Sequence, residues 1–483
     1  MAQRMMFLTS TLIEKITGGE WFNLDYDIQF HGIRVNIKRL EKNDICFCTN
    51  PKQWGKKIVN SEKSLNKIFE NGASAAVIID KNLVTTINKP LLLVPNSKKA
   101  LEDIAFYVRD NIKIPRILVT GTEGKTGYKN QLYTLLNFQT KVHAKLDSSN
   151  LNVPIMCSMA SIADDEKVEI IEASVAGPNV GVTRSKLVQP DICVITQVGI
   201  AHITTHGSVK NMISNKASIV EALKDDGICI INGDSDNYDA VREEIYKRKY
   251  VDIKTFGSNS KFNAYIINSS FNKTDLLWDI EAKIEDIEIK YQVPLLGDYV
   301  PVASLIPLLT IYYLGYDVKK AAADFIKFKS MDTMGGLSEI KTKDMSFKFF
   351  DHSHRGSKLG YTSALKDFAF MNPSKKGKKI AVIGHMMNIG KISKQAHADL
   401  APLIESANVD RIYTVGKFTK PMYENLKDKS IFVAHGDKYQ DIEEQFLADI
   451  EDGDIIFMKG NHRIWLKELA TKLYDMGQRN AIR

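Results

Sequence analysis

Residues 117–126 read Ile-Leu-Val-Thr-Gly-Thr-Glu-Gly-Lys-Thr, and this stretch decides the fold of the chain. Residues 117–120 are apolar or β-branched, which predicts a buried strand. The following loop ends in Gly-Lys-Thr. In loops of this kind, backbone N–H groups surround the phosphates of a nucleotide, a lysine contacts the outer phosphates and a hydroxyl binds Mg²⁺. We therefore predict a nucleotide-binding loop formed by Gly121, Thr122, Glu123, Gly124, Lys125 and Thr126.

The loop matches the general phosphate-loop pattern only in part. That pattern requires a glycine five residues before Gly124, and Val119 stands there. An ordinary glycine turn is the alternative interpretation. The shorter form Gly-Thr-x-Gly-Lys-Thr is more informative, because it resembles the ATP loop of the Mur ligase family.

Composition favours a globular cytoplasmic protein. The chain has 483 residues, 44% hydrophobic and 25% charged, with no apolar run near the ~20 residues that span a membrane. The net charge of +7 is spread along the chain, and its densest basic cluster, residues 375–379, contains no aromatic residues. The five cysteines form no C-x-x-C pair, which favours reduced thiols. We expect no membrane insertion and no nucleic-acid partner.

Alternating strand and helix patterns predict an α/β fold of three domains. These are a small N-terminal α/β domain (1–114), a central parallel-sheet P-loop ATPase domain (115–328) and a C-terminal Rossmann-like α/β domain (329–483). In the central domain we predict strands at 117–120, 168–172, 192–196 and 228–232, and helices at 128–136 and 305–314. In the others we predict strands at 74–79, 91–94, 379–383, 411–415, 431–433 and 454–458, and a helix at 99–111.

Further stretches resemble the Mur ligases in the family's order, over nearly the whole chain. The strongest covers residues 190–208, where the family has a strand ending in Thr-Asn-Ile-Gly-x-x-His, and His202 stands at the histidine position. Further matches are residues 149–154, the Asn-Lys pair that contains Lys216 and the Asn-Gly-Asp stretch that begins at Asn232. The resemblance is closest to members that add D-alanyl-D-alanine to the peptidoglycan precursor.

One metal-binding residue follows from the residues themselves. Glu172 closes a strand beside the loop, where its carboxylate suits Mg²⁺, a hard cation. The resemblance implies the same for Glu172 and Thr126, a metal-supporting role for His202, and a carbamylated Lys216 that acts as a ligand. The alternatives are a solvated strand-end acid, a structural histidine and an ordinary surface lysine.

The resemblance also implies a reaction. ATP phosphorylates a carboxylate to an acyl phosphate, which an amine attacks with release of phosphate. The predicted catalytic residues are Lys125, Lys216 and His202, and Asn232 and Asp351 join the loop as nucleotide-binding residues. The cofactors are ATP and Mg²⁺, the N-terminal domain binds the carboxylate, the C-terminal domain binds the amine, and the enzyme is expected to be a monomer.

Departures from the family lie mainly in the third segment. The family's Gly-Arg-x-Glu reads Gly-Gly-Leu-Ser at 335–338, and its Asp-Asp becomes Asp351 and His352. The central His-Asn reads Tyr-Val at 299–300, Gly-Asp-Met reads Gly-His-Met at 384–386, and Lys-Gly-Ser-Arg reads Lys-Gly-Asn-His at 459–462. Arg355 and Arg463 are candidates for a displaced positive charge. His352, His354 and His385 form either a new local site or unrelated surface positions.

Three hypotheses follow. The first is an ATP-dependent amide ligase acting on a non-standard cell-surface, cell-wall or secondary-metabolite substrate, because the third domain and the uridine-nucleotide segment of the first are altered. The second is the peptidoglycan ligase that adds D-alanyl-D-alanine to UDP-N-acetylmuramoyl-tripeptide. The third is a non-catalytic nucleotide-binding partner subunit, against which the retained loop, Glu172, His202 and Lys216 argue.

Overall fold

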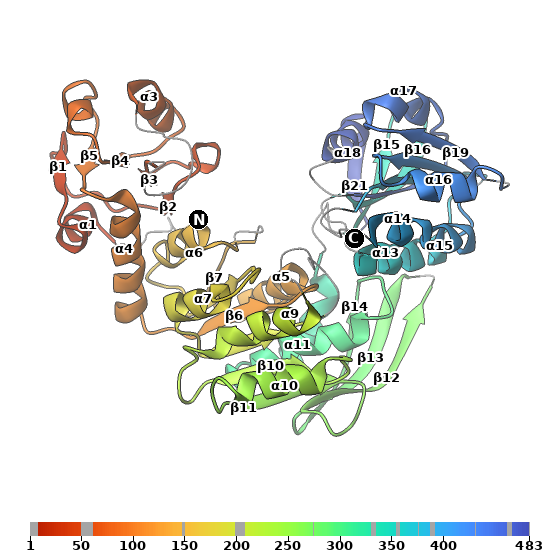
Figure 1. The fold of residues 1–483 in the computed structure, drawn as a ribbon, viewed down its shortest axis with the longest axis horizontal. Coiled ribbons are helices and arrows are strands. Elements are labelled where there is room, and N and C mark those ends of the chain that lie inside the picture. Colours follow the sequence, from red (N-terminus) through yellow and green to blue (C-terminus); the bar gives the residue numbers. More distant parts are fainter. Residues whose placement is uncertain are drawn as a thin grey trace.

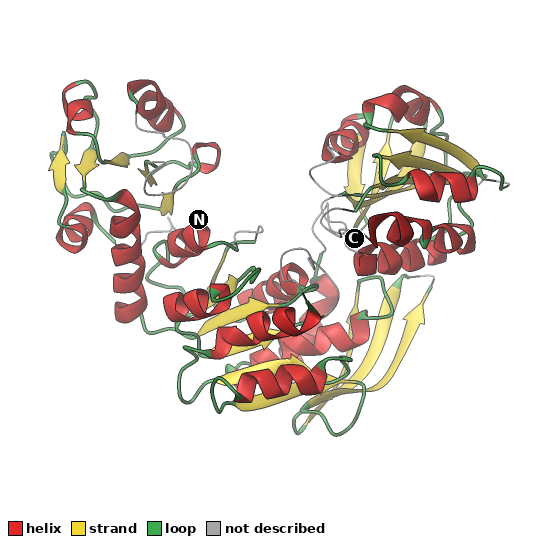
Figure 2. Cartoon of the chain, viewed as in Figure 1, coloured by secondary structure: helices red, strands yellow, loops and turns green. Residues whose placement is uncertain are grey.

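Three α/β units, each built on its own sheet, make up the chain (Figure 1, Figure 2). A computed structural model describes residues 8–49, 61–146, 150–198, 208–273, 275–329, 335–353, 358–374, 376–386, 392–429, 431–460 and 466–482. The central unit lies between the other two, and the predicted fold class is confirmed. None of the helices in these ranges is long and apolar enough to span a membrane. The five cysteines are buried free thiols, as predicted.

The N-terminal unit is a five-stranded sheet in the order β1-β5-β4-β3-β2, parallel except for the edge strand β1. Helix α4 connects this unit to the centre. It begins two residues before the predicted start, because the Asn96 side chain caps it by accepting from the N–H groups of Lys98 and Lys99, both at 3.0 Å. The elements are α1 (Ser10–Thr17), β1 (Glu20–Phe22), β2 (Gly32–Arg34), β3 (Asp44–Phe47), α3 (Glu62–Glu70), β4 (Ala75–Ile78), β5 (Leu91–Leu93) and α4 (Ser97–Asn111).

The central unit is a nine-stranded sheet in the order β14-β13-β12-β11-β10-β9-β6-β8-β7. The strand that precedes the glycine loop, β6, lies between β8 and β9 and pairs parallel with both. Its strands are β6 (Arg116–Thr120), β7 (Val142–Ala144), β8 (Val168–Glu172), β9 (Ile192–Ile195), β10 (Ile228–Asn232), β11 (Asp252–Gly257), β12 (Ala264–Asn272), β13 (Leu277–Ile284) and β14 (Ile287–Val293).

Helices cover both faces of the central sheet. One core contains residues of α6, α7, α9 and α10 together with the N-terminal unit, and the other contains α5, α11 and α12. The carboxyl ends of the parallel strands, where ligands of such sheets bind, therefore lie between two packed layers. The helices are α5 (Lys125–Asn137), α6 (Asn152–Met159), α7 (Val180–Val188), α9 (Val209–Ala217), α10 (Tyr238–Tyr246), α11 (Val300–Tyr313) and α12 (Val318–Asp324).

The structure extends the sequence prediction in two places. Strands β12, β13 and β14 form an antiparallel extension of the sheet that was not predicted, although β14 alternates buried and exposed residues as such strands do. Helix α11 begins five residues before the predicted start, and it is a buried helix that includes Pro307.

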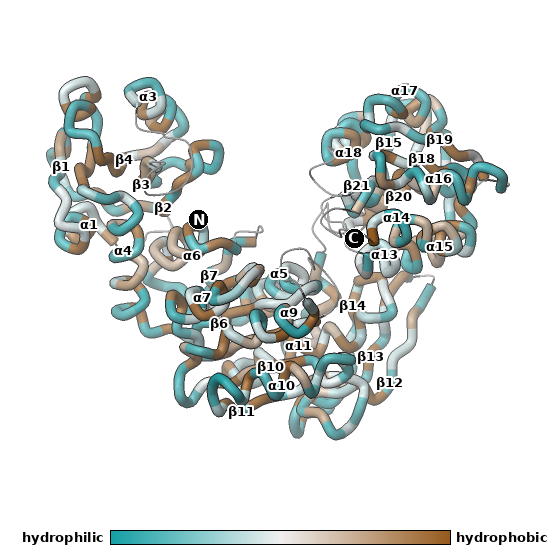
Figure 3. The backbone as a smooth tube through the Cα atoms, viewed as in Figure 1, coloured by the Kyte–Doolittle hydropathy of each residue, from teal (hydrophilic) through white to brown (hydrophobic). Residues whose placement is uncertain are grey.

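The C-terminal unit is a seven-stranded sheet in the order β19-β18-β17-β20-β16-β15-β21, with β15 and β21 antiparallel at one edge. Lys379, the last residue of the basic cluster, begins β17 as predicted; it is buried and donates to the carbonyl of Phe368 at 2.8 Å. Hydrophobic residues gather within each unit (Figure 3). The strands are β15 (Gly336–Lys341), β16 (Ser346–His352), β17 (Lys379–Gly384), β18 (Arg411–Val415), β19 (Phe432–Gly436), β20 (Ile455–Lys459) and β21 (Gln478–Ala481). The helices are α13 (Lys358–Phe370), α14 (Ser393–Ala398), α15 (Ala401–Ser406), α16 (Lys420–Leu426), α17 (Gln440–Ala448) and α18 (Leu466–Asp475).

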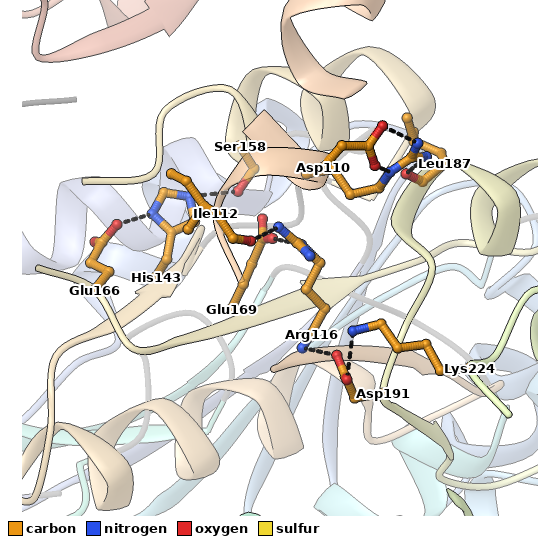
Figure 4. A network of polar contacts seen from close by, with 11 residues as sticks. Asp110, Ile112, Arg116, His143, Ser158, Glu166, Glu169, Leu187, Asp191 and Lys224 are labelled. Carbon is orange, nitrogen blue, oxygen red and sulfur yellow. Dashed lines mark hydrogen bonds and ion pairs between the residues drawn. The ribbon is translucent and has the colours of Figure 1, made fainter. Parts of the chain in front are cut away.

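A buried ion pair fixes the strands that carry the loop (Figure 4). Arg116 Nε lies 3.1 Å from Glu169 Oε2, and the Arg116 N–H donates to Asp191 Oδ2 at 2.8 Å. The ion pair therefore joins β6 to β8, and the backbone hydrogen bond to Asp191 joins β6 to the start of β9. Burial raises the pKa of Glu169, which His143 and Arg116 oppose. The carboxylate depends on these neighbours to stay ionised.

We expect Arg116→Met to destabilise the protein by about 3–5 kcal/mol, because it leaves the Glu169 carboxylate buried and uncompensated. Urea unfolding at neutral pH would measure the loss. The double variant Arg116→Met with Glu169→Gln removes both charges and should recover most of the stability. A single variant as stable as the wild type would contradict a dependence on this pair.

Candidate nucleotide and metal site

The glycine loop joins β6 to α5 at the centre of the largest sheet. Helix α5 begins at Lys125, three residues before the predicted start, with Gly124 as its N-cap at φ +82° and no side-chain cap. N–H groups at an uncapped helix start attract anions, and the helix dipole adds to the attraction. A Cβ on Gly121 would lie 2.1 Å from Thr196 Oγ1, so only glycine fits there.

The two residues that follow strand β9, Thr196 and Gln197, hold the first residues of the loop. The Thr122 N–H donates to the Gln197 carbonyl at 2.6 Å, and Thr196 Oγ1 donates to the Glu123 carbonyl at 2.5 Å. Asn232, at the end of β10, donates to Gln197 Oε1 at 2.8 Å. Asn232 thus reaches the loop through Gln197, and its predicted nucleotide contact stays a prediction.

Two buried lysines converge on one backbone oxygen of the loop. Lys125 Nζ donates to the Gly121 carbonyl at 2.6 Å and to the Thr122 carbonyl at 3.1 Å, and Lys216 Nζ donates to the Gly121 carbonyl at 3.0 Å. Burial, and next the charge of Lys125, lower the pKa of Lys216 to about 7. Such a concentration of positive charge suits the phosphates of a nucleotide.

Glu172, at the end of β8, faces the first turn of α5. Its Oε2 accepts from Thr126 Oγ1 at 2.8 Å and lies 3.2 Å from Lys129 Nζ, and its Oε1 accepts from Asn150 Nδ2 at 3.0 Å. The arrangement brings a carboxylate and a hydroxyl together beside the loop, as predicted.

The donor chemistry at this point fits Mg²⁺ in part. Thr126 and Glu172 offer the hard oxygen atoms that Mg²⁺ prefers. Lys216 as an amine offers no oxygen, so it could join such a set only as a carbamate. Within the described ranges, no group of three His, Cys, Asp or Glu side chains is placed to hold a metal. His202 lies outside the described residues.

Asp351, predicted to bind the nucleotide, belongs to β16 of the C-terminal sheet rather than to the loop cluster. It is fully buried, and its carboxylate accepts from the Ser353 N–H at 2.8 Å and from the Tyr474 hydroxyl at 3.1 Å. These contacts tie it to its own unit. Its role toward a nucleotide remains a prediction.

The sequence interpretation left out three residues of this cluster: Lys129, Asn150 and Gln197. Lys129 could have been suspected, because it follows Lys125 by four residues and so shares its face of α5. Asn150 belongs to the family-like segment but had no assigned partner. Gln197 departs from the family's asparagine, and its carbonyl and side chain both face the loop neighbourhood.

Of the three histidines singled out in the third segment, the structure describes His352 and His385, and both are half-buried. His352 packs against the rings of Phe350 and Phe457, and burial, with the nearby Lys459, lowers its pKa well below the usual range. Burial and Lys417 lower the pKa of His385. Both rings are therefore neutral near pH 7. His354, Arg355 and Arg463 lie outside the described residues.

The C-terminal unit contacts the central unit at the start of α11. Lys366 Nζ of α13 lies 3.6 Å from Asp298, and the Phe370 ring packs against Phe271 of β12. Asp367 of α13 is buried beside these contacts, and burial, with the nearby Asp298, raises its pKa to about 7. The last turns of α13 therefore contact the central unit.

Comparisons with known proteins agree with this geometry. Residues 119–301 match the model of the Mur ligase middle domain. The UDP-N-acetylmuramoyl-tripeptide–D-alanyl-D-alanine ligase of Rickettsia prowazekii is 26% identical over 91% of this chain and 94% of its own.

Two solved structures share the whole fold. The UDP-N-acetylmuramoylalanyl-D-glutamyl-2,6-diaminopimelate–D-alanyl-D-alanyl ligase of Acinetobacter baumannii superposes with a TM-score of 0.79 at 16% identity, covering 98% of this chain and 99% of its own. The MurF ligase of Thermotoga maritima, in complex with ADP, gives 0.70 at 19% identity over 92% and 97%. With the loop, Glu172 and Lys216 assembled in one cluster, these matches show that residues 119–301 resemble the Mur ligase middle domain and that the whole chain shares the fold of Mur ligases.

Proposed function

We propose that this chain is an ATP-dependent amide ligase that joins D-alanyl-D-alanine to UDP-N-acetylmuramoyl-tripeptide. The observation that carries the proposal is the convergence of Lys125 and Lys216 on the Gly121 carbonyl, next to the Thr126–Glu172 pair. The named relatives supply the substrates. They favour this peptidoglycan reaction over the non-standard substrate that the altered third segment suggested, and we no longer favour that substrate.

The chain's residues divide the chemistry among them. The N–H groups at the start of α5 and the Lys125 ammonium would hold the outer phosphates and neutralise the charge that develops during phosphoryl transfer to the carboxylate. The acyl phosphate that results is attacked by the amine, and phosphate leaves. Thr126 and Glu172 would hold Mg²⁺, which when bound neutralises phosphate charge. His202 and Asp351 keep their predicted roles in this scheme.

The three units have separate tasks in the proposal. Residues 1–114 bind the carboxylate substrate, 115–328 bind ATP, and 329–483 bind the amine and exclude water from the acyl phosphate. We expect a monomer in the cytoplasm that binds small molecules and no nucleic acid. The remaining alternative is a partner subunit that binds nucleotide without catalysis.

Phosphate release separates the ligase from the non-catalytic subunit. The purified chain is given ATP, Mg²⁺ and UDP-N-acetylmuramoyl-tripeptide, with or without D-alanyl-D-alanine, and phosphate and peptide product are measured. We expect sustained release only when both substrates are present, because the acyl phosphate turns over when the amine consumes it. ATP binding without release under any of these conditions would favour the non-catalytic subunit.

Lys125→Ala should lower kcat at least about a hundredfold, because it removes a preorganised charge from the phosphoryl-transfer site. The matched control is Lys141→Ala, an exposed lysine paired with Asp165 outside the site, which should leave kcat unchanged. Steady-state kinetics of both variants test the assignment. A Lys125→Ala enzyme with near-normal kcat would exclude the role given to this lysine.

The lowered pKa of Lys216 predicts a bicarbonate-dependent activity. Above pH about 7 the amine is neutral and can take up CO₂ with loss of a proton, giving the anionic carbamate that the family resemblance implies. Below that pH the amine is protonated, so the carbamate and the activity should fall together. Carbon-13 NMR with labelled bicarbonate should give a carbamate signal in the wild type.

The same signal should be lost in Lys216→Arg and kept in Lys224→Arg, a partly exposed lysine paired with Asp191. A fully active enzyme without the signal, at every pH from 6 to 9, would contradict a carbamate at Lys216 while leaving the ligase proposal intact.

A further inference from the structure

Arg184, on α7, is a buried cation that pairs with no carboxylate among the residues that the structure describes. Arg184 is 5% exposed, and its Nε donates to Asn152 Oδ1 at 3.1 Å. Its Nη1 has no hydrogen-bond partner among the residues that the structure describes. Burial lowers the pKa of Arg184 to about 10, and no neighbouring carboxylate opposes that shift. An unpaired buried guanidinium is costly, because its desolvation is uncompensated.

The other well-buried arginine of this unit shows the usual solution. Arg116 is 2% exposed and pairs with Glu169 at 3.1 Å. Arg184 lacks such a carboxylate, although its guanidinium has the fork geometry that binds carboxylate or phosphate groups through two parallel hydrogen bonds. The missing partner is therefore expected to be an anion supplied by a ligand.

The surroundings of α7 place this cation between the nucleotide site and the N-terminal unit. A Cβ on Gly181 of α7 would lie 2.1 Å from Ser218 Oγ, so α7 packs closely against the segment that carries Lys216. At the other end of α7, Arg109 of α4 donates to the carbonyls of Lys186 and Leu187 at 3.1 and 3.2 Å. Arg184 lies between these two contacts.

A short asparagine segment links Arg184 to Glu172. Asn150 donates to Glu172 Oε1 at 3.0 Å, and Asn152, two residues on, accepts from Arg184 Nε. The Asn152 side chain is exposed, so solvent reaches the rim of the guanidinium site. An anion bound there would lie close to the carboxylate that is proposed to support phosphoryl transfer.

We propose that the Arg184 guanidinium binds a carboxylate or phosphate group of the acyl substrate and orients that substrate toward the phosphate loop. The proposal rests on the proposed function and names a residue that recognises its first substrate. The A. baumannii ligase is named for a substrate that contains UDP, glutamyl and diaminopimelate parts. A glutamyl residue in one amide bond keeps a free carboxylate, and UDP supplies two phosphates, so either part offers a suitable anion.

The test compares Arg184→Met and Arg184→Lys with the wild type. In Arg184→Met, the dissociation constant for UDP-N-acetylmuramoyl-tripeptide, measured by calorimetry without ATP, should rise about ten- to a hundredfold. KM for the same compound should rise by a similar factor, the loss expected for a charged hydrogen-bonding partner. KM for ATP should stay within about twofold. Arg184→Lys should recover part of the affinity, because it restores the charge but not the fork.

Thermal unfolding distinguishes a ligand-binding arginine from a structural one. Without ligand, Arg184→Met should unfold at the same temperature as the wild type or higher, since it removes an unpaired buried charge. The control Arg248→Met removes a half-buried arginine that lies 2.8 Å from Glu221, so it should unfold at a lower temperature and keep its KM for the tripeptide.

Two analogues identify the anion. One has the free glutamyl carboxylate converted to an amide, and the other lacks UDP. The wild type should lose affinity for the analogue without the contacted group, and Arg184→Met should show a much smaller loss for that analogue. If both losses are the same in the variant as in the wild type, or if the folded variant binds the tripeptide normally, the proposal is wrong. A wild type that binds the tripeptide but forms no product would contradict the proposed function instead.

Discussion

The backbone carbonyl of Gly121 is the point on which the rest of the site depends. Two lysines from different helices donate to this one oxygen, and Thr196, directly after β9, leaves no room for a Cβ on the same residue. The carbonyl therefore fixes α5, α9 and β9 relative to each other. Because like charges repel, holding Lys125 and Lys216 together costs free energy. The favourable interaction with a bound anionic ligand would offset this cost.

The same repulsion connects geometry to chemistry at Lys216. A lysine far from another cation would stay protonated at neutral pH, and burial beside Lys125 shifts it toward the neutral amine. The neutral form is the one that can react with CO₂. Burial, and next the charge of Lys125, thus change the chemistry of Lys216, and the strand order of the sheet brings the two helices together.

The sequence predicted the parts of the fold that depend on local pattern. The apolar runs of β6, β8, β9 and β10 were located to within one residue at each end, since strands buried on both faces read as continuous apolar runs. Glu172 was found because an acid at a strand end beside such a loop has few structural reasons to be there. Lys129 and Arg184 were not found, because the Glu172 partner of Lys129 is far away in the sequence and the burial of Arg184 depends on the tertiary fold.

The third segment shows where motif comparison reaches its limit. The substitution of a family acid by His352 looked like a change in a binding surface, yet the half-buried ring packs edge-on against Phe350 and Phe457. A side chain buried in this way acts first on the shape and charge of its surroundings. Divergence at such positions is therefore compatible with an unchanged reaction in the central unit.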